Sequence, residues 1–405
     1  MAYMVRQSIM DKEQKVLGYE MRYYDEAAGT SDNENTAANA VSNILTQIGD
    51  QNITDDKPVF LNFTWNLLQR KVPEMFNTDS LIMIVEDSIL IDPHSNETML
   101  EYKKKGYKVA IADFLFLPRY FGVLDSVDYI RLNFKYNDTS NYGNIIKLAK
   151  AFDKKIIGYD IETKQAYDAA VELGCDYFIG SFVAEKTPTE VKKSDFLQGN
   201  FFQLLAAVTK PEVSYDEVSE IISHDVNLTY ALLKLVNSAW FALRNEAKTV
   251  KQALVVLGIG QLKQWIYLLS FRQSGGKSPD ELIKLSFLRA TFAQALTKYV
   301  KDLPINDSEA YLLGMFSTLD KLTGAPFTES LRELTISPDI KKALILGQGS
   351  CGTLLKVIVS YENAKWSDMK EYAEQLGIPS DKAPQIYFEC VEEVNKIWHG
   401  ISHSE

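Results

Sequence analysis

The sequence is poor in the residues that build disulfide frameworks and histidine-rich metal sites. Among its 405 residues there are only three cysteines and four histidines. The cysteines, Cys175, Cys351 and Cys390, are odd in number and widely spaced. A disulfide framework is therefore excluded, and a reducing cytoplasm is the expected location. The scarcity of histidine limits any metal site that depends on imidazole ligands.

Long apolar runs and an excess of positive charge are also missing. The longest apolar run, at 253–259, is far shorter than the roughly 20 residues that span a bilayer. The amino-terminal residues lack the pattern of a signal peptide. Acidic residues outnumber basic ones by 54 to 43, which gives a net charge of −11. Because phosphate contacts need clustered cations, we expect no nucleic-acid partner and no membrane partner.

The composition that is present is that of a globular protein with two domains. Hydrophobic residues make up 46% and charged residues 24% of the chain. Single hydrophobic cores rarely grow beyond about 250–300 residues, so 405 residues suggest two of them. The polar stretch at 185–195 lacks the regularly spaced apolar residues of a helix or strand, and we interpret it as the linker between the two domains. We expect a first domain at 1–190 and a second at 191–405.

The first half alternates short β-branched or aromatic runs with helical patterns such as 36–48. The first two strands are joined by only four residues, 11–14, which is too short for a crossover helix, so they must pair antiparallel. The pattern predicts an α/β TIM-like (β/α)8 barrel with an antiparallel first strand; a doubly wound open sheet is the alternative. The predicted strands are 3–9, 16–24, 58–63, 81–86, 108–113, 128–133, 155–159 and 176–180.

From residue 201 onward the strand signal disappears. Apolar faces of helical period are separated by proline and glycine, which predicts an all-α helical domain after the barrel. The clearest predicted helices are 217–222, 228–236, 282–299 and 385–398.

Polar residues stand where the predicted barrel strands end, which is where barrels of this type carry their function. They are Glu20, Asn62, Glu86, Asp113, Arg131, Asn133 and Glu162. In this order and spacing, the elements GYEMRYYD, VFLNFT, IMIVEDS, VAIADFLFL, YIRLNF and IIGYDIET resemble the EAL domain of cyclic di-GMP phosphodiesterases over roughly residues 1–185. The resemblance implies hydrolysis of a phosphodiester by two divalent cations held by carboxylate and amide oxygens.

The chain departs from that family at positions that the resemblance assigns to metals. The signature E-A-L reads Glu20-Met21-Arg22, and Asn62 keeps the amide ligand. Carboxylates are replaced at three positions, Met83, Ala112 and Tyr159. Losing several oxygen ligands should weaken metal binding severely, because a thioether is a poor partner for Mg²⁺. We therefore expect no metal, no cofactor and no catalytic residue.

Further departures affect the groups that would act on the substrate. The Lys and Asp of the family's K-x-D element are Arg131 and Asn133, and a planar guanidinium has a different reach from an ammonium group. The arginine that follows the family's E-A-L signature is replaced here by Tyr24, and the glutamine near the end of the family's domain is replaced by Ile179. Without metals the remaining carboxylates would repel phosphates by about 4 kcal/mol per unit-charge pair at 4 Å. Cyclic di-GMP is thus disfavoured as a ligand, and we expect the remaining acids to be buried, hydrogen-bonded barrel residues.

The stretches EVSEIISHDVNLTYALLKLVNSAWF and KTVKQALVVLGIGQLKQWIYLLSF resemble the HDOD domain of bacterial signalling proteins. That domain is a helical relative of the HD phosphohydrolases without their metal ligands. His224 and Asp225 alone do not enclose a cation, so we interpret Asp225 as a helix N-cap. The residues that carry the resemblance are Asp225, Leu228, Leu232, Asn237, Ser238, Ala253, Leu257 and Gly258.

A glycine-rich element at 347–352 fits the pattern G-x-G-x-x-G. The residues before it, 339–346, follow Pro338 and read as a helix rather than a strand, so a turn between two helices is expected in place of a phosphate cradle. Cys351 in this turn is expected to be a buried structural thiol.

Together these features predict a non-catalytic signal-transduction scaffold or regulatory protein. It would act through protein–protein interaction, with other signalling proteins bound by the helical domain. The alternatives are a divergent metal-dependent cyclic di-GMP phosphodiesterase and a cyclic di-GMP receptor. The sequence leaves a homodimer open.

Overall fold

The computed structural model describes residues 2–25, 41, 53–112, 114, 117–135, 139–186, 204, 207–208, 210, 212–224, 226–237, 247–272, 280–331 and 336–402. The chain divides into two compact units. The first comprises Met1–Lys186 together with Val359–Met369 and Ala383–Phe388. The second comprises Thr187–Ile358, Lys370–Lys382 and Glu389–Glu405. Two short segments from the carboxyl-terminal part of the sequence thus belong to the first unit.

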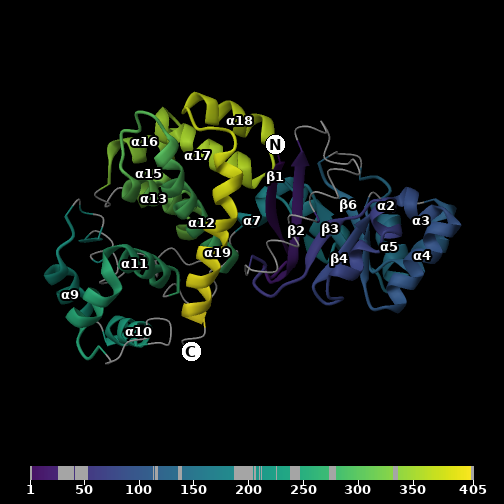
Figure 1. Cartoon of the computed structure of the whole chain (residues 1–405), viewed down its shortest axis with the longest axis horizontal. Helices are drawn as coiled ribbons and strands as arrows, with labels where there is room; N and C mark the ends of the chain where they lie inside the picture. The colour runs from purple at the N-terminus through teal and green to yellow at the C-terminus, as the bar shows by residue number, and fades with distance from the viewer. Residues whose placement is uncertain are drawn as a thin grey trace. The chain divides into compact units, whose positions relative to one another are not determined.

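The first unit is a closed barrel of eight strands in sequence order (Figure 1). Strand β1 is antiparallel to both of its neighbours, and all other neighbouring strands are parallel. This confirms the TIM-like barrel with an antiparallel first strand, and the open-sheet alternative is wrong. The strands are β1 (Ala2–Met10), β2 (Val16–Asp25), β3 (Val59–Asn62), β4 (Leu81–Val85), β5 (Lys108–Ile111), β6 (Tyr129–Asn133), β7 (Lys155–Tyr159) and β8 (Tyr177–Phe178).

Helices follow most of the strands and are capped by local sequence signals. Asp92 begins α4 by accepting a 2.8 Å hydrogen bond from the Ser95 backbone N–H, and Gly174 ends α6 in the left-handed conformation. The predicted helix at 36–48 lies outside the described residues apart from Val41, which is helical. The unit's helices are α2 (Trp65–Gln69), α3 (Asp87–Ile91), α4 (Pro93–Lys104), α5 (Tyr142–Ala151), α6 (Lys164–Leu173) and α7 (Ser181–Ala184), with 3-10 turns η1 (Val72–Met75) and η2 (Pro118–Ser126).

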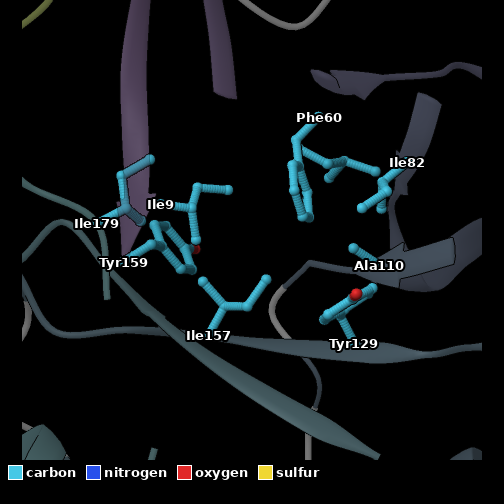
Figure 2. Close-up of a cluster of buried hydrophobic side chains, with 9 residues drawn as sticks. Ile9, Phe60, Ile82, Ala110, Tyr129, Ile157, Tyr159 and Ile179 are labelled. Atoms are coloured by element: carbon cyan, nitrogen blue, oxygen red, sulfur yellow. The ribbon is translucent and has the colours of Figure 1, made fainter. Parts of the chain in front are cut away.

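The barrel interior is filled with apolar and aromatic side chains, as Figure 2 shows. Phe60 and Tyr129 meet edge to face with their ring centroids 5.7 Å apart. Side chains alternate between the two faces of a strand, so the inward residues of each strand are two apart. The buried interior cluster comprises Ile9, Phe60, Ile82, Ile84, Ala110, Tyr129, Ile157, Tyr159 and Ile179.

The described part of the second unit is helical throughout and contains no strand, which confirms the all-α prediction. Its helix α13 begins with a capping box between Asn306 and Glu309. The helices of the carboxyl-terminal half are α9 (Tyr215–Ser223), α10 (Val226–Val236), α11 (Val250–Arg272), α12 (Asp280–Leu296), α13 (Asp307–Phe316), α14 (Leu319–Thr323), α15 (Phe327–Ser330), α16 (Pro338–Leu346), α17 (Gly349–Glu362), α18 (Trp366–Gln375) and α19 (Lys382–Ser402), with a 3-10 turn η3 (Thr297–Tyr299).

Glycine positions the turns of this unit. The glycine-rich element comprises the turn between α16 and α17 and the first residues of α17: Gly347 ends α16 with φ 64°, and a Cβ on Gly352 would lie 2.6 Å from the Gly347 carbonyl carbon. This confirms the helix–turn–helix interpretation and the burial of Cys351. Gly258, with φ 73° and ψ 162°, kinks α11 in a conformation that L side chains rarely adopt.

Among the described residues no single helix has the length and apolar character to cross a bilayer. One bent pair, α16 with α17, meets that test by length and composition, with a 51° bend between its helices.

Candidate functional site

The carboxyl ends of β2, β6 and β7 bring four charged side chains together. Glu20 and Arg22 lie two apart on β2, and Arg131 lies two residues after the interior residue Tyr129 on β6, so all three point to the inside of the barrel. Asp160 follows the last residue of β7 directly and has a left-handed φ of 56°. These four residues line one side of what we call the barrel mouth.

The central contact of the mouth is a buried ion pair. Nη2 of Arg131 donates a 2.6 Å hydrogen bond to Oε2 of Glu20, and the two side chains are only 5% and 7% exposed. The Arg131 guanidinium carbon also lies 4.6 Å from the centroid of the Tyr159 ring. Nε of Arg131 is buried and has no hydrogen-bond partner among the residues that the structure describes. Glu20, the first residue of the E-A-L signature, is therefore paired with the guanidinium of Arg131, which lies on β6 on the other side of the barrel.

A second ion pair adjoins the first. Nη2 of Arg22 donates a 2.6 Å hydrogen bond to Oδ1 of Asp160, and its Nε lies 3.6 Å from Oε1 of Glu20. Nδ2 of Asn133 donates to the other oxygen of Asp160 at 3.2 Å. Burial opposes the charge of Arg22, but Glu20 and Asp160 outweigh burial and raise the Arg22 pKa. Two arginines and two carboxylates thus neutralise one another.

The other predicted site residues are not gathered into this network. Asn62 and Glu86 are exposed at the ends of β3 and β4, where Glu86 accepts a 3.3 Å hydrogen bond from Oγ of Ser88. Glu162 is exposed and lies 3.6 Å from Nζ of Lys365, while Asp113 falls outside the described residues. The expectation of buried, hydrogen-bonded acids therefore fits Glu20 and does not fit Glu86 or Glu162.

The described residues do not fit a pair of divalent cations. In the part of the chain that the structure describes, which leaves out Asp113, no three His, Cys, Asp or Glu side chains are arranged to hold a metal ion. The inward positions near the mouth are hydrocarbon at Ile84 and Ala112 and phenolic at Tyr159. Hard cations bind oxygen donors in greater number than these residues supply.

The barrel register also corrects one assignment made from the sequence. Met83 stands between the interior residues Ile82 and Ile84, so its side chain points away from the lumen, where it is fully buried. The inward residue at this level of β4 is Ile84. The lumenal position therefore holds the hydrocarbon side chain of Ile84 in place of the thioether of Met83 that the sequence predicted.

In the helical unit the polar signature residue Asn237 bonds to the backbone. The side-chain amide of Asn237 donates to the Ala247 carbonyl at 2.9 Å and accepts from the Ala247 N–H at 2.7 Å, which joins the end of α10 to the segment before α11. His224 ends α9 with Nδ1 2.7 Å from the Glu220 carbonyl. Asp225 and Ser238 lie outside the described residues. Asn237 thus has a structural role in linking these two segments.

Sequence reasoning did not select Arg22 or Asp160 as site residues. For Arg22 a signal existed, because a residue two positions after Glu20 on the same strand shares its face. For Asp160 the pairing depends on the closure of the barrel, which brings the end of β7 near β2. No local pattern indicates that contact.

Comparisons with known proteins match part of the helical region to a family and nearly the whole chain to two bacterial proteins. Residues 196–334 match the family described as the HDOD domain. The chain is 27% identical over 403 residues to the uncharacterized protein YuxH of Bacillus subtilis, covering 96% of this chain and 97% of that protein. It is 25% identical over 397 residues to a Vibrio cholerae protein named cyclic di-GMP phosphodiesterase CdgJ, covering 96% of this chain and 91% of that protein.

Solved structures similar to the chain include EAL domains. One is the EAL domain of Mycobacterium smegmatis DcpA, with 16% sequence identity and a TM-score of 0.37. The similarity covers 45% of this chain and 92% of that domain. The protein is thus related to a protein named as a cyclic di-GMP phosphodiesterase, and its helical half carries the predicted HDOD match.

Proposed function

We propose that this protein is a signal-transduction component whose EAL-like barrel does not hydrolyse cyclic di-GMP and whose helical domain binds other signalling proteins. The observation that supports the loss of chemistry is the 2.6 Å ion pair between Arg131 and Glu20. A carboxylate in that pair has its charge already compensated. Glu20 is therefore a poor metal ligand. The surrounding hydrocarbon side chains supply no oxygen donors to a metal.

The energetics favour the ion pair over a metal in that position. A cation that recruited Glu20 would leave Arg131, which is 4% exposed, as an uncompensated buried charge. Removing one partner of a buried pair typically costs about 3–5 kcal/mol. The metal would have to overcome this cost with fewer oxygen donors than a two-cation site uses.

A divergent phosphodiesterase is the second candidate, and the similarity to CdgJ over 397 residues favours it. For this candidate to hold, Glu20 must leave Arg131 when substrate and metal bind. The remaining ligands would then come from exposed groups at the strand ends, among which Glu86 and Asn62 are available.

The two candidates are separated by incubating the full chain with cyclic di-GMP and Mg²⁺ or Mn²⁺ and analysing the products by chromatography. We expect no linear dinucleotide above the no-protein control. Formation of linear product that Glu20→Gln abolishes, and that the exposed-surface control Glu172→Gln retains, would support the phosphodiesterase and reject the proposal.

A cyclic di-GMP receptor is tested by calorimetry of the same full chain without metal. We expect no heat of binding, because the arginines of the mouth are already paired with carboxylates. A saturable signal that Arg22→Met removes would support the receptor instead.

The helical unit offers exposed apolar side chains for a partner protein. Tyr230 on α10 is 66% exposed and Val255 on α11 is 73% exposed, on helices that pack against each other. Aromatic side chains of this kind are typical anchors of protein interfaces. In affinity capture from the source organism, Tyr230→Asp with Val255→Asp should lose partners that Phe152→Asp, a substitution of an exposed barrel residue, retains. Equal capture by both variants would contradict a partner surface on α10 and α11.

A further inference from the structure

Among the described residues the contact between β1 and β8, which we call the seam of the barrel, is short. Strand β8 is two residues long, and β1 pairs with it at Met10 opposite Phe178. The remainder of β1, from Ala2 to Ile9, continues past β8 towards the mouth.

The segment Val359–Met369, which belongs to the same compact unit, contacts β1. Oη of Tyr361 donates a 2.8 Å hydrogen bond to the Met4 carbonyl, and Tyr361 is fully buried. The side chain of Gln7 donates a 2.9 Å hydrogen bond from Nε2 to the Glu362 carbonyl. The end of α17 therefore lies against β1.

The first residue of α18, Trp366, continues this contact on the inner face of the hairpin. Its ring stacks on Tyr3, with centroids 5.5 Å apart and planes 27° apart, and on Tyr24, with centroids 6.4 Å apart and planes 23° apart. Tyr3 and Tyr24 are direct partners in the β1–β2 register, as are Gln7 and Glu20. Because direct partners share a face and faces alternate, Trp366 covers the same face that carries Glu20 and Arg22.

The residue before it reaches the opposite side of the seam. Nζ of Lys365 lies 3.6 Å from Oε2 of Glu162, which follows β7. Both side chains are close to half exposed, so this ion pair adds little to stability. Its effect is to fix the position of the turn between α17 and α18. The aromatic contacts of Tyr361 and Trp366 supply the main attraction, because they are largely buried.

We propose that residues 361–366 form a built-in strap that holds the β1–β2 hairpin and covers one side of the barrel mouth. The strap consists of the last residues of α17 and the first residue of α18, all of which belong to the first unit. This inference depends on the barrel contacts alone and holds whether or not the barrel hydrolyses cyclic di-GMP.

The test is hydrogen exchange of the full chain, read by mass spectrometry in peptides that cover β1 and β2. Trp366→Ala should speed exchange in the hairpin by at least about tenfold and leave α13 unchanged, because local opening is governed by local contacts. The matched control is Trp65→Ala, which removes a similar ring from the barrel helix α2. It should leave hairpin exchange unchanged.

Hairpin exchange that stays within about twofold of the native protein in Trp366→Ala would overturn the proposal, and so would an equal acceleration in Trp65→Ala. If Trp366→Ala does not accumulate as folded protein, Tyr24→Leu takes its place, because it removes the ring beneath the indole. Trp366→Phe should retain slow exchange, since a smaller aromatic ring still stacks on Tyr3.

Discussion

The guanidinium of Arg131 and the carboxylate of Glu20 form a 2.6 Å hydrogen bond across the barrel, from β6 to β2. Both side chains are more than nine-tenths buried. This contact turns a carboxylate that the EAL resemblance assigns to a metal into one half of an ion pair. The pair joins Arg131, which replaces the lysine of the K-x-D element, to Glu20, which is the retained glutamate of the E-A-L element.

Removing the basic partner should destabilise the barrel strongly. Arg131→Met leaves Glu20 buried with only Arg22 nearby, and we expect a loss of about 3–5 kcal/mol in the free energy of unfolding. Adding Glu20→Gln should restore a large part of that loss, because no buried charge is then left without a partner. Urea denaturation followed by circular dichroism measures both values.

Lys155→Met is the control for that cycle, because Lys155 pairs with Asp176 at 3.7 Å on the surface and is 53% exposed. It should change stability by less than about 0.5 kcal/mol. Additive losses from Arg131→Met and Glu20→Gln would show that the two residues act independently and would contradict the pairing.

The packing of α12 against α13 predicts a sharp difference between two glycines. A Cβ on Gly314 would lie 2.2 Å from the Arg289 carbonyl oxygen, so Gly314→Ala must push the two helices apart. We expect a loss of several kcal/mol, at or above the roughly 1–3 kcal/mol typical of overpacking. Gly260 in α11 has no atom of the described residues within 4 Å of such a Cβ, and Gly260→Ala should be neutral or stabilising. Thermal denaturation of both variants tests this; equal midpoints would refute it.

The buried thiols predict a loss of stability at high pH. Burial raises the pKa of Cys390 to about 12 and that of Cys351 to about 11, against 9.0 for an ordinary thiol. Because the folded state holds these thiols neutral, their contribution is present below pH 9 and is lost as pH rises towards 11–12. The denaturation midpoint should therefore fall across that range.

Cys351→Ala should make the fall with pH shallower, because one group with a raised pKa is gone. At neutral pH, Ellman's reagent should label both thiols only as fast as the protein opens, since the thiolate is the reactive form. Rapid labelling of Cys390 in the native protein would contradict its burial.

Strand existence and order were predictable because each barrel strand is a short apolar run bounded by turn residues. The antiparallel start followed from the four-residue connection at 11–14, which leaves no length for a crossover. The turn at Gly347 was also predictable, since it depends on local backbone needs. The inward direction of Ile84 in place of Met83 was not, because the strand register is set by neighbouring strands.

The sequence by itself determined the strands, the helices, the apolar interior and the loss of carboxylates near the strand ends, because periodicity and residue type are local properties. Only the tertiary structure decided that Arg131 neutralises Glu20, that Asp160 pairs with Arg22, and that Trp366 stacks on Tyr3. These contacts join residues 111, 138 and 363 positions apart. Barrel closure and the return of α17 to β1 bring them together, and no pattern within a short window of sequence encodes such a distance.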